Sequence, residues 1–147
     1  MKVTAHQNEM RRRNLRRGAA AIEFAIVLPV LLVALLGMTD FGRFSYTAVA
    51  VANAARSGAE YGSMNTCDAN NPGPWQAGIT QAAVDEFSQM SGFDSSLLTV
   101  TVNTATESNG LRRVSVQVAY PFHTLTTWGW IPNSFNLQQT VVMRGLR

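Results

Sequence analysis

Residues 18–39 read GAAAIEFAIVLPVLLVALLGMT, a run of 22 residues in which Glu23 is the single charged side chain. At about 1.5 Å per residue, a helix of this length covers roughly 33 Å, which is close to the hydrocarbon thickness of a bilayer. A core helix of a soluble domain is the alternative, but no comparable apolar segment follows to surround it. The run therefore predicts a transmembrane helix, which we place at residues 19–42. Pro29 lies inside it and is expected to kink it.

The basic residues are concentrated in front of this span. Six of the 12 basic residues precede position 18, accompanied by one acid, whereas residues 19–147 carry six basic and eight acidic residues. Positive residues beside an apolar span mark its cytoplasmic end. We therefore expect a basic cytoplasmic leader at residues 1–18 and an extracytoplasmic domain at residues 43–147. Nucleic-acid binding is not expected, because no basic or aromatic positions elsewhere extend the patch.

A cleaved secretory signal is a second interpretation of a basic start followed by an apolar core. A small-x-small cleavage site should follow such a core closely, but residues 37–43 read GMTDFGR. A twin-arginine signal fits Arg12 and Arg13 only loosely. Neither signal accounts for an acid near the start of the apolar run.

Glu23 is the informative residue of the span. A carboxylate in a membrane helix costs about 2.5–3.5 kcal/mol, so it usually has a partner and a function. One interpretation is that Glu23 lies shallow and reaches the cytoplasmic interface. The other starts from cleavage after Gly18, which would give Ala19 a new α-ammonium. Ala19 and Glu23 are four residues apart and share a helix face, so the carboxylate could pair with this amine or with that of a neighbouring subunit.

The segment from Arg17 to Phe24, RGAAAIEF, resembles a type IV prepilin processing site. The longer stretch RRGAAAIEFAIVLPVLLVALLGMTDFGR, with the later AARSGAEYG, resembles the TadE-like minor pilins, or pseudopilins, of the tight adherence (Flp) pilus system. The resemblance implies that a prepilin peptidase cuts between Gly18 and Ala19, and that Glu23 and Phe24 guide subunit packing. That branch commonly has tyrosine after the glutamate, where this chain has Phe24.

The resemblance also implies a location and partners. We expect a single-pass protein of the bacterial inner membrane, with a cytoplasmic N terminus and a periplasmic C-terminal domain. Incorporation into an extracellular pilus is a further expectation. The implied partners are other pilus subunits, assembly-platform proteins and the prepilin peptidase, in a homo- or hetero-oligomer.

Two helices are expected after the span. Residues 45–61 continue as a helix with a stripe of small residues, Ala48, Ala52, Ala55 and Ala59, that packs on the protein's own sheet or on a neighbouring subunit. Residues 62–75 are expected to form a loop, which contains Cys67, either a free thiol or a link between chains. Residues 76–90 predict an amphipathic helix with Ile79, Ala83, Val84 and Phe87 on one face.

From Leu98 onward the apolar residues recur at every second position, which is typical of β-strands. Leu98, Val100 and Val102 alternate with polar residues, and so do Val114, Val116, Val118 and Tyr120, in a strand that Pro121 is expected to end. Residues 107–110 supply turn chemistry, residues 128–132 an aromatic turn, and residues 135–144 a last strand. The fold class is therefore α+β: a long N-terminal transmembrane helix, followed by a small domain with helices packed on a three- or four-stranded antiparallel sheet.

No catalytic, metal or cofactor site is predicted. His6 and His123 lack ligand partners at a suitable spacing, and the adjacent Asp85 and Glu86 point in different directions on a helix. An enzyme is not expected. Two functional hypotheses remain: a processed minor pilin or pseudopilin, and an unprocessed single-pass protein whose outer domain binds another envelope component or a surface ligand.

Overall fold

The computed structural model describes residues 3–68, 70–108, 110–127, 129 and 132–145, with side chains from Ala20 onward. The elements are helices α1 (Val3–Met64) and α2 (Gly73–Ser88), a short 3-10 helix at Ser95–Leu97, and strands β1 (Thr99–Thr106), β2 (Arg112–His123) and β3 (Ser134–Arg144). The chain divides into two compact units, the first ending at Phe41 and the second beginning at Gly42. The predicted α+β class with a long N-terminal apolar helix is confirmed.

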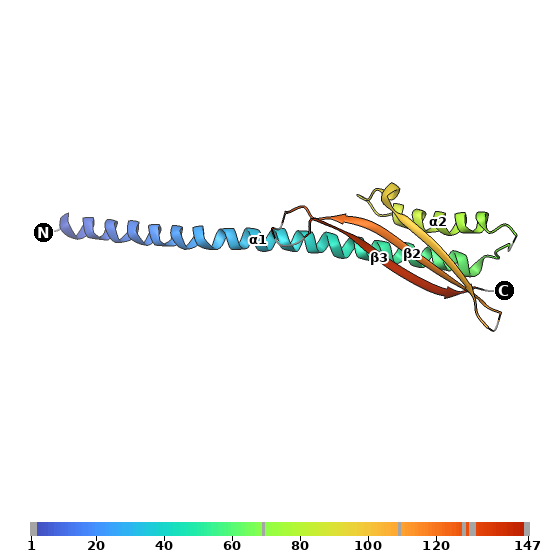
Figure 1. Cartoon of the computed structure of the whole chain (residues 1–147). Helices are drawn as coiled ribbons and strands as arrows, with labels where there is room; N and C mark the ends of the chain where they lie inside the picture. The colour runs from blue at the N-terminus through green and yellow to red at the C-terminus, as the bar shows by residue number, and fades with distance from the viewer. Residues whose placement is uncertain (1–2, 69, 109, 128, 130–131, 146–147) are drawn as a thin grey trace. The chain divides into compact units, whose positions relative to one another are not determined.

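The second unit is built on the C-terminal part of α1. Within this unit, α2 and the sheet lie beside the Gly42–Met64 part of α1 (Figure 1). The helix face that packs inward consists of small and β-branched residues, namely Thr47, Ala50, Val51, Ala54, Ala55 and Ala59. The predicted stripe is therefore rotated: Ala55 and Ala59 are buried, whereas Ala48 and Ala52 are half-buried at its margin. The face packs on the protein's own elements.

Helix α2 begins three residues earlier than predicted, at Gly73. Pro74 lies in its first turn, where the missing N–H of proline costs no helical hydrogen bond, so the Pro-rich stretch starts the helix instead of extending the loop. Its buried residues recur every four positions, at Trp75, Ile79, Ala83 and Phe87, while the predicted Val84 is half-buried. The helix ends at Ser88, two residues before the predicted end.

The sheet has three antiparallel strands in the order β1-β2-β3. Val114 is opposite Thr104 and Met143, and the register continues to Thr99↔Ala119 on one side and His123↔Ser134 on the other. The turn between β1 and β2 is closed by the Glu107 N–H, which donates to the Leu111 carbonyl at 2.8 Å. Gly110 adopts a φ of +78° in this turn, a region that favours glycine.

Pro121 was predicted to end this strand, and that prediction is wrong: Pro121 lies inside β2, opposite Asn136. The pairing of β1 with β2 stops at Thr99↔Ala119. Beyond that point β2 has a single neighbour, so it is locally an edge strand, where proline is tolerated. Of the predicted aromatic turn at 128–132, Trp128, Trp130 and Ile131 lie outside the described residues.

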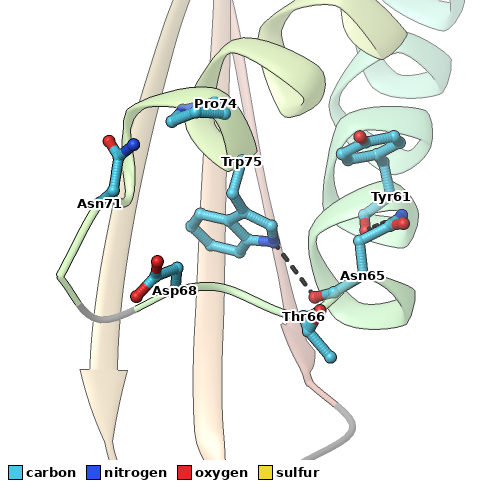
Figure 2. A pocket seen from close by; sticks show the side chains of 7 residues that line it. All are labelled: Tyr61, Asn65, Thr66, Asp68, Asn71, Pro74 and Trp75. Atoms are coloured by element: carbon cyan, nitrogen blue, oxygen red, sulfur yellow. Dashed lines mark hydrogen bonds between the residues drawn. The ribbon is translucent and has the colours of Figure 1, made fainter.

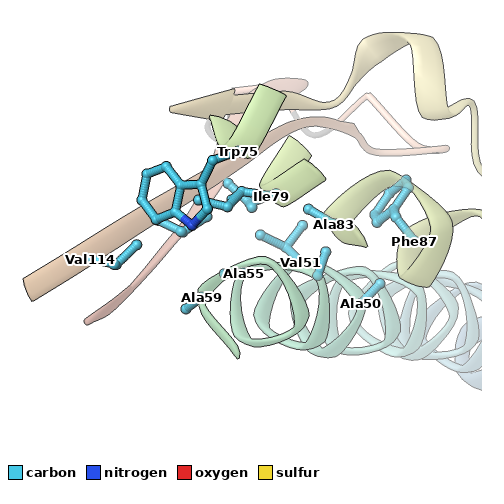
Figure 3. Close-up of a cluster of buried hydrophobic side chains, with 12 residues drawn as sticks. Ala50, Val51, Ala55, Ala59, Trp75, Ile79, Ala83, Phe87 and Val114 are labelled. Atoms are coloured by element: carbon cyan, nitrogen blue, oxygen red, sulfur yellow. The ribbon is translucent and has the colours of Figure 1, made fainter. Parts of the chain in front are cut away.

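The core lies between α1, α2 and the inner face of the sheet (Figure 3). Val114, Val116 and Val118 of β2 point into it together with the buried faces of both helices. At one side of the core the Phe87 ring lies 4.9 Å from the Tyr120 ring and 5.2 Å from the Phe93 ring, measured between centroids. The opposite face of the sheet carries mainly uncharged polar side chains.

Candidate functional site

The apolar part of α1 is the first candidate site. From Ile22 to Met38 its large side chains are exposed within the chain, from 39% for Leu28 to 73% for Met38. Apolar residues surround the helix on all sides, which is typical of a helix embedded in lipid or in an assembly. In the part of the chain that the structure describes, α1 alone is long and apolar enough to cross a membrane. These properties support a single-pass membrane protein.

The predicted processing residues lie within this helix. Because α1 is unbroken from Val3 to Met64, Gly18, Ala19 and Glu23 are all helical, and Ala19 and Glu23 are one turn apart on one face. The Glu23 and Phe24 side chains are exposed, and among the described side chains Glu23 has no ion-pair or hydrogen-bond partner. Pro29 also lies inside the helix, and the kink stays a prediction. Cleavage and packing likewise remain predictions.

The residues that begin the second unit are tied to the end of β2. The Arg43 guanidinium donates to the His123 carbonyl at 3.3 Å, and its central carbon lies 5.5 Å from the Phe122 ring centroid. The Phe44 ring packs against the Phe122 ring, with 5.9 Å between the two centroids. The start of this unit's helix is therefore fixed to the end of β2 by a cation–π contact and an aromatic pair.

The motif AARSG at residues 54–58 has a packing explanation. Ala54 and Ala55 are buried, and the Ser57 hydroxyl donates to the Ala82 carbonyl of α2 at 3.3 Å. A Cβ at Gly58 would lie 3.2 Å from the carbonyl oxygen of Ile79. Small side chains at these positions are therefore required for the close approach of α1 and α2.

A second candidate lies where α1 ends. A cavity of about 310 Å³ is lined by Tyr61, Asn65, Thr66, Asp68, Asn71, Pro74 and Trp75 (Figure 2). The Trp75 indole N–H donates to the Asn65 carbonyl at 3.2 Å. On the same carbonyl, the Arg112 guanidinium donates at 2.9 Å and stacks 4.7 Å from the Trp75 ring centroid. Arg112 therefore caps the C-terminal end of α1.

Sequence reasoning missed this cluster. It placed Trp75 in a loop and gave Arg112 no role, because nothing in the local pattern connects two residues 37 positions apart. Cys67 is a free, half-buried thiol packed beside the core. Among the described residues no group of three or more His, Cys, Asp or Glu side chains is placed to hold a metal ion.

The fold and the apolar segment together indicate a single-pass membrane protein with a small α+β second unit. Residues 18–60 match the family model of the TadE-like proteins, so the chain is TadE-like over this stretch and the resemblance is confirmed there. The match lies wholly within α1, from Gly18 through the Ala54–Gly58 motif. No curated protein and no solved structure matches the chain.

Proposed function

We propose that the chain is a minor pilin or pseudopilin that takes part in assembly of a tight adherence pilus. The observation that carries this is the TadE-like match at residues 18–60, which begins at Gly18 and includes Glu23 within an exposed apolar helix. The protein is inserted with its N terminus in the cytoplasm, and a prepilin peptidase cuts after Gly18. It is a structural protein and not an enzyme.

Processing changes the electrostatics of the helix start. Hydrolysis of the Gly18–Ala19 bond leaves a carboxylate on the leader and an amine on Ala19, which takes up a proton near neutral pH. The new cation lies one helical turn from Glu23. Pairing with it, in the same or a neighbouring subunit, offsets the cost of placing the carboxylate in an apolar environment. An intersubunit pair also fixes the axial register between packed helices.

In this proposal the apolar helix supplies the surface that packs against lipid and other subunits, and the second unit stays outside the membrane. The side chains from Ile22 to Met38, which no described residue covers, can pack in lipid before assembly and against other subunits afterwards. The small residues of the second unit hold α2 and the sheet on the Gly42–Met64 part of α1.

An unprocessed membrane anchor is the alternative, with the outer unit binding another envelope component. One observation favours it. The Gly18–Ala19 bond lies inside α1 in the intact chain, and a helical bond must unwind before a peptidase can hold it extended. The proposed cleavage therefore requires local opening of α1 around Gly18.

Replacement of Glu23 tests the packing role. We expect Glu23→Ala to be inserted at the normal level, because removal of a charge favours insertion, but to lower piliation as strongly as deletion of the chain. The matched control is Glu60→Ala, which removes an exposed acid from the same helix outside the apolar span. Immunoblots of membranes and counts of pili by electron microscopy provide the two measurements. Normal piliation with Glu23→Ala contradicts the proposal.

A further inference from the structure

The basic residues of the second unit gather at one end of the sheet. Five arginines are described after position 19, and three of them, Arg112, Arg113 and Arg144, lie at the end of the sheet where β1 turns into β2. Among the described side chains, the acid of Glu107 lies beside them. Residues 19–147 are acidic as a whole, with eight acids and six basic residues, so this corner is a local reversal of charge.

Two of these arginines face each other. Arg113 and Arg144 are directly opposite in the register of β2 and β3, so both side chains leave the sheet on the same face. Their neighbour Val114 is fully buried, which places Arg113 on the face away from the core. Like charges directly opposite across a sheet are destabilising. A third charge of opposite sign is therefore favoured at this position.

The two arginines differ in how their charge is used. The Arg144 Nε lies 3.3 Å from the Glu107 Oε2, and the Glu107 side chain is 19% exposed. Among the residues that the structure describes, Arg113 has no ion pair and no hydrogen-bond partner. A cavity of about 330 Å³ opens beside it, lined by Asn103, Thr104, Ala105, Arg113, Ser115 and Val142. Amide and hydroxyl groups accompany the guanidinium in this cavity, and all of them can hydrogen-bond to an oxyanion.

We propose that this corner, which we call the Arg113 corner (Asn103, Arg113, Ser115 and Arg144), binds a carboxylate presented by an acidic segment of a partner protein. The planar guanidinium of Arg113 matches a carboxylate in a two-point contact, and Asn103 and Ser115 supply further hydrogen bonds. A carboxylate is favoured over a phosphate because Glu107 is already in the corner. Repulsion from Glu107 is greater for a group with nearly two negative charges.

The position of the corner favours a protein over the lipid headgroups of the membrane that α1 enters. Arg112 donates to the carbonyls of Gly62 and Asn65, so the corner lies at the C-terminal end of α1. The second unit begins at Gly42. Twenty residues of helix separate Gly42 from Gly62, which corresponds to about 30 Å. The proposal does not depend on the pilin function, since either a pilus subunit or a passive anchor could bind such a partner.

The test is a titration of the purified full-length protein in detergent micelles with a hexaglutamate peptide, followed by two-dimensional NMR at low ionic strength. We expect saturable binding with shifts centred on Arg113 and Ser115. Arg113→Gln should weaken the affinity about fivefold, the size expected for loss of an accessible ion pair of up to about 1 kcal/mol. The matched control is Arg56→Gln, which removes an exposed arginine from α1 and should leave the affinity unchanged.

Two further arms separate the remaining outcomes. Inorganic phosphate should bind more weakly than the peptide, and tighter phosphate binding would overturn the assignment of a carboxylate ligand. Equal losses for Arg113→Gln and Arg56→Gln would show a general charge effect and would also overturn the proposal. So would unchanged affinity with Arg113→Gln. Arg113→Lys keeps the charge and should retain part of the affinity, which guards against loss through misfolding.

Discussion

Arg112 and Trp75 act together at the residue scale. The guanidinium donates to carbonyls at the end of α1, where the helix macrodipole also favours a positive charge, and it stacks on the indole. The Arg112 Nε is buried without a hydrogen-bond partner in the described part of the chain. Its desolvation reduces the gain from the cluster, so the contacts of the Nη2 and of the ring carry the stabilisation.

We therefore expect Arg112→Gln to lower the free energy of unfolding of the second unit by about 1–3 kcal/mol, through loss of a charged cap and a cation–π contact. The neighbouring exposed Arg113 is the control, and Arg113→Gln should change stability by less than about 0.5 kcal/mol. Denaturant unfolding in detergent, followed by Trp fluorescence, measures both. Equal effects of the two substitutions would show that the cap is not specific.

At the scale of elements, the two helices of the second unit are held together by their small residues. A Cβ at Gly58 would lie 3.2 Å from a backbone carbonyl oxygen and 3.3 Å from Val116, and the backbone atom has little freedom to move away. Gly42 lies in the same helix with nothing within 4 Å of its Cβ position. The same residue type thus serves a packing purpose at one position and none at the other.

This contrast predicts opposite signs for two substitutions. Gly58→Val should destabilise the second unit by about 1–3 kcal/mol, because the added methyl groups overpack the interface between α1 and α2. Gly42→Ala should stabilise α1 by about 0.5–1 kcal/mol, because alanine loses less backbone entropy in a helix. Thermal unfolding followed by circular dichroism reports both. If Gly58→Val were tolerated without loss, the close packing of the helices would be wrong.

The elements also show which features can be read from a sequence. The apolar span follows from its length and composition, and the continuation of α1 and all three strands follow from the periodicity of their apolar residues. Three predictions were wrong: the start of α2, the end of β2 at Pro121 and the position of the small-residue stripe around α1. The last two depend on neighbours. Pro121 is allowed because β1 pairs with β2 only as far as Ala119, and the stripe is rotated because α2 and β2 meet α1 together.

At the scale of the whole molecule, the TadE-like match covers only part of α1, and α2 and the sheet lie outside it. Residues 18–60 include the apolar span and the packing motif of α1, and both were recognisable from local sequence. The Arg113 corner joins residues of all three strands, and Arg112 reaches Trp75 and Asn65 from β2. No short motif records such pairings, so the candidate partner surfaces could not be predicted from sequence.

The central claim, removal of the basic leader, is tested most directly by intact mass spectrometry of the protein extracted from native membranes. The account predicts a mature chain that begins at Ala19, and a Gly18→Leu variant that keeps its leader. A native protein that still carries all of its first eighteen residues would contradict processing and leave an uncleaved membrane anchor.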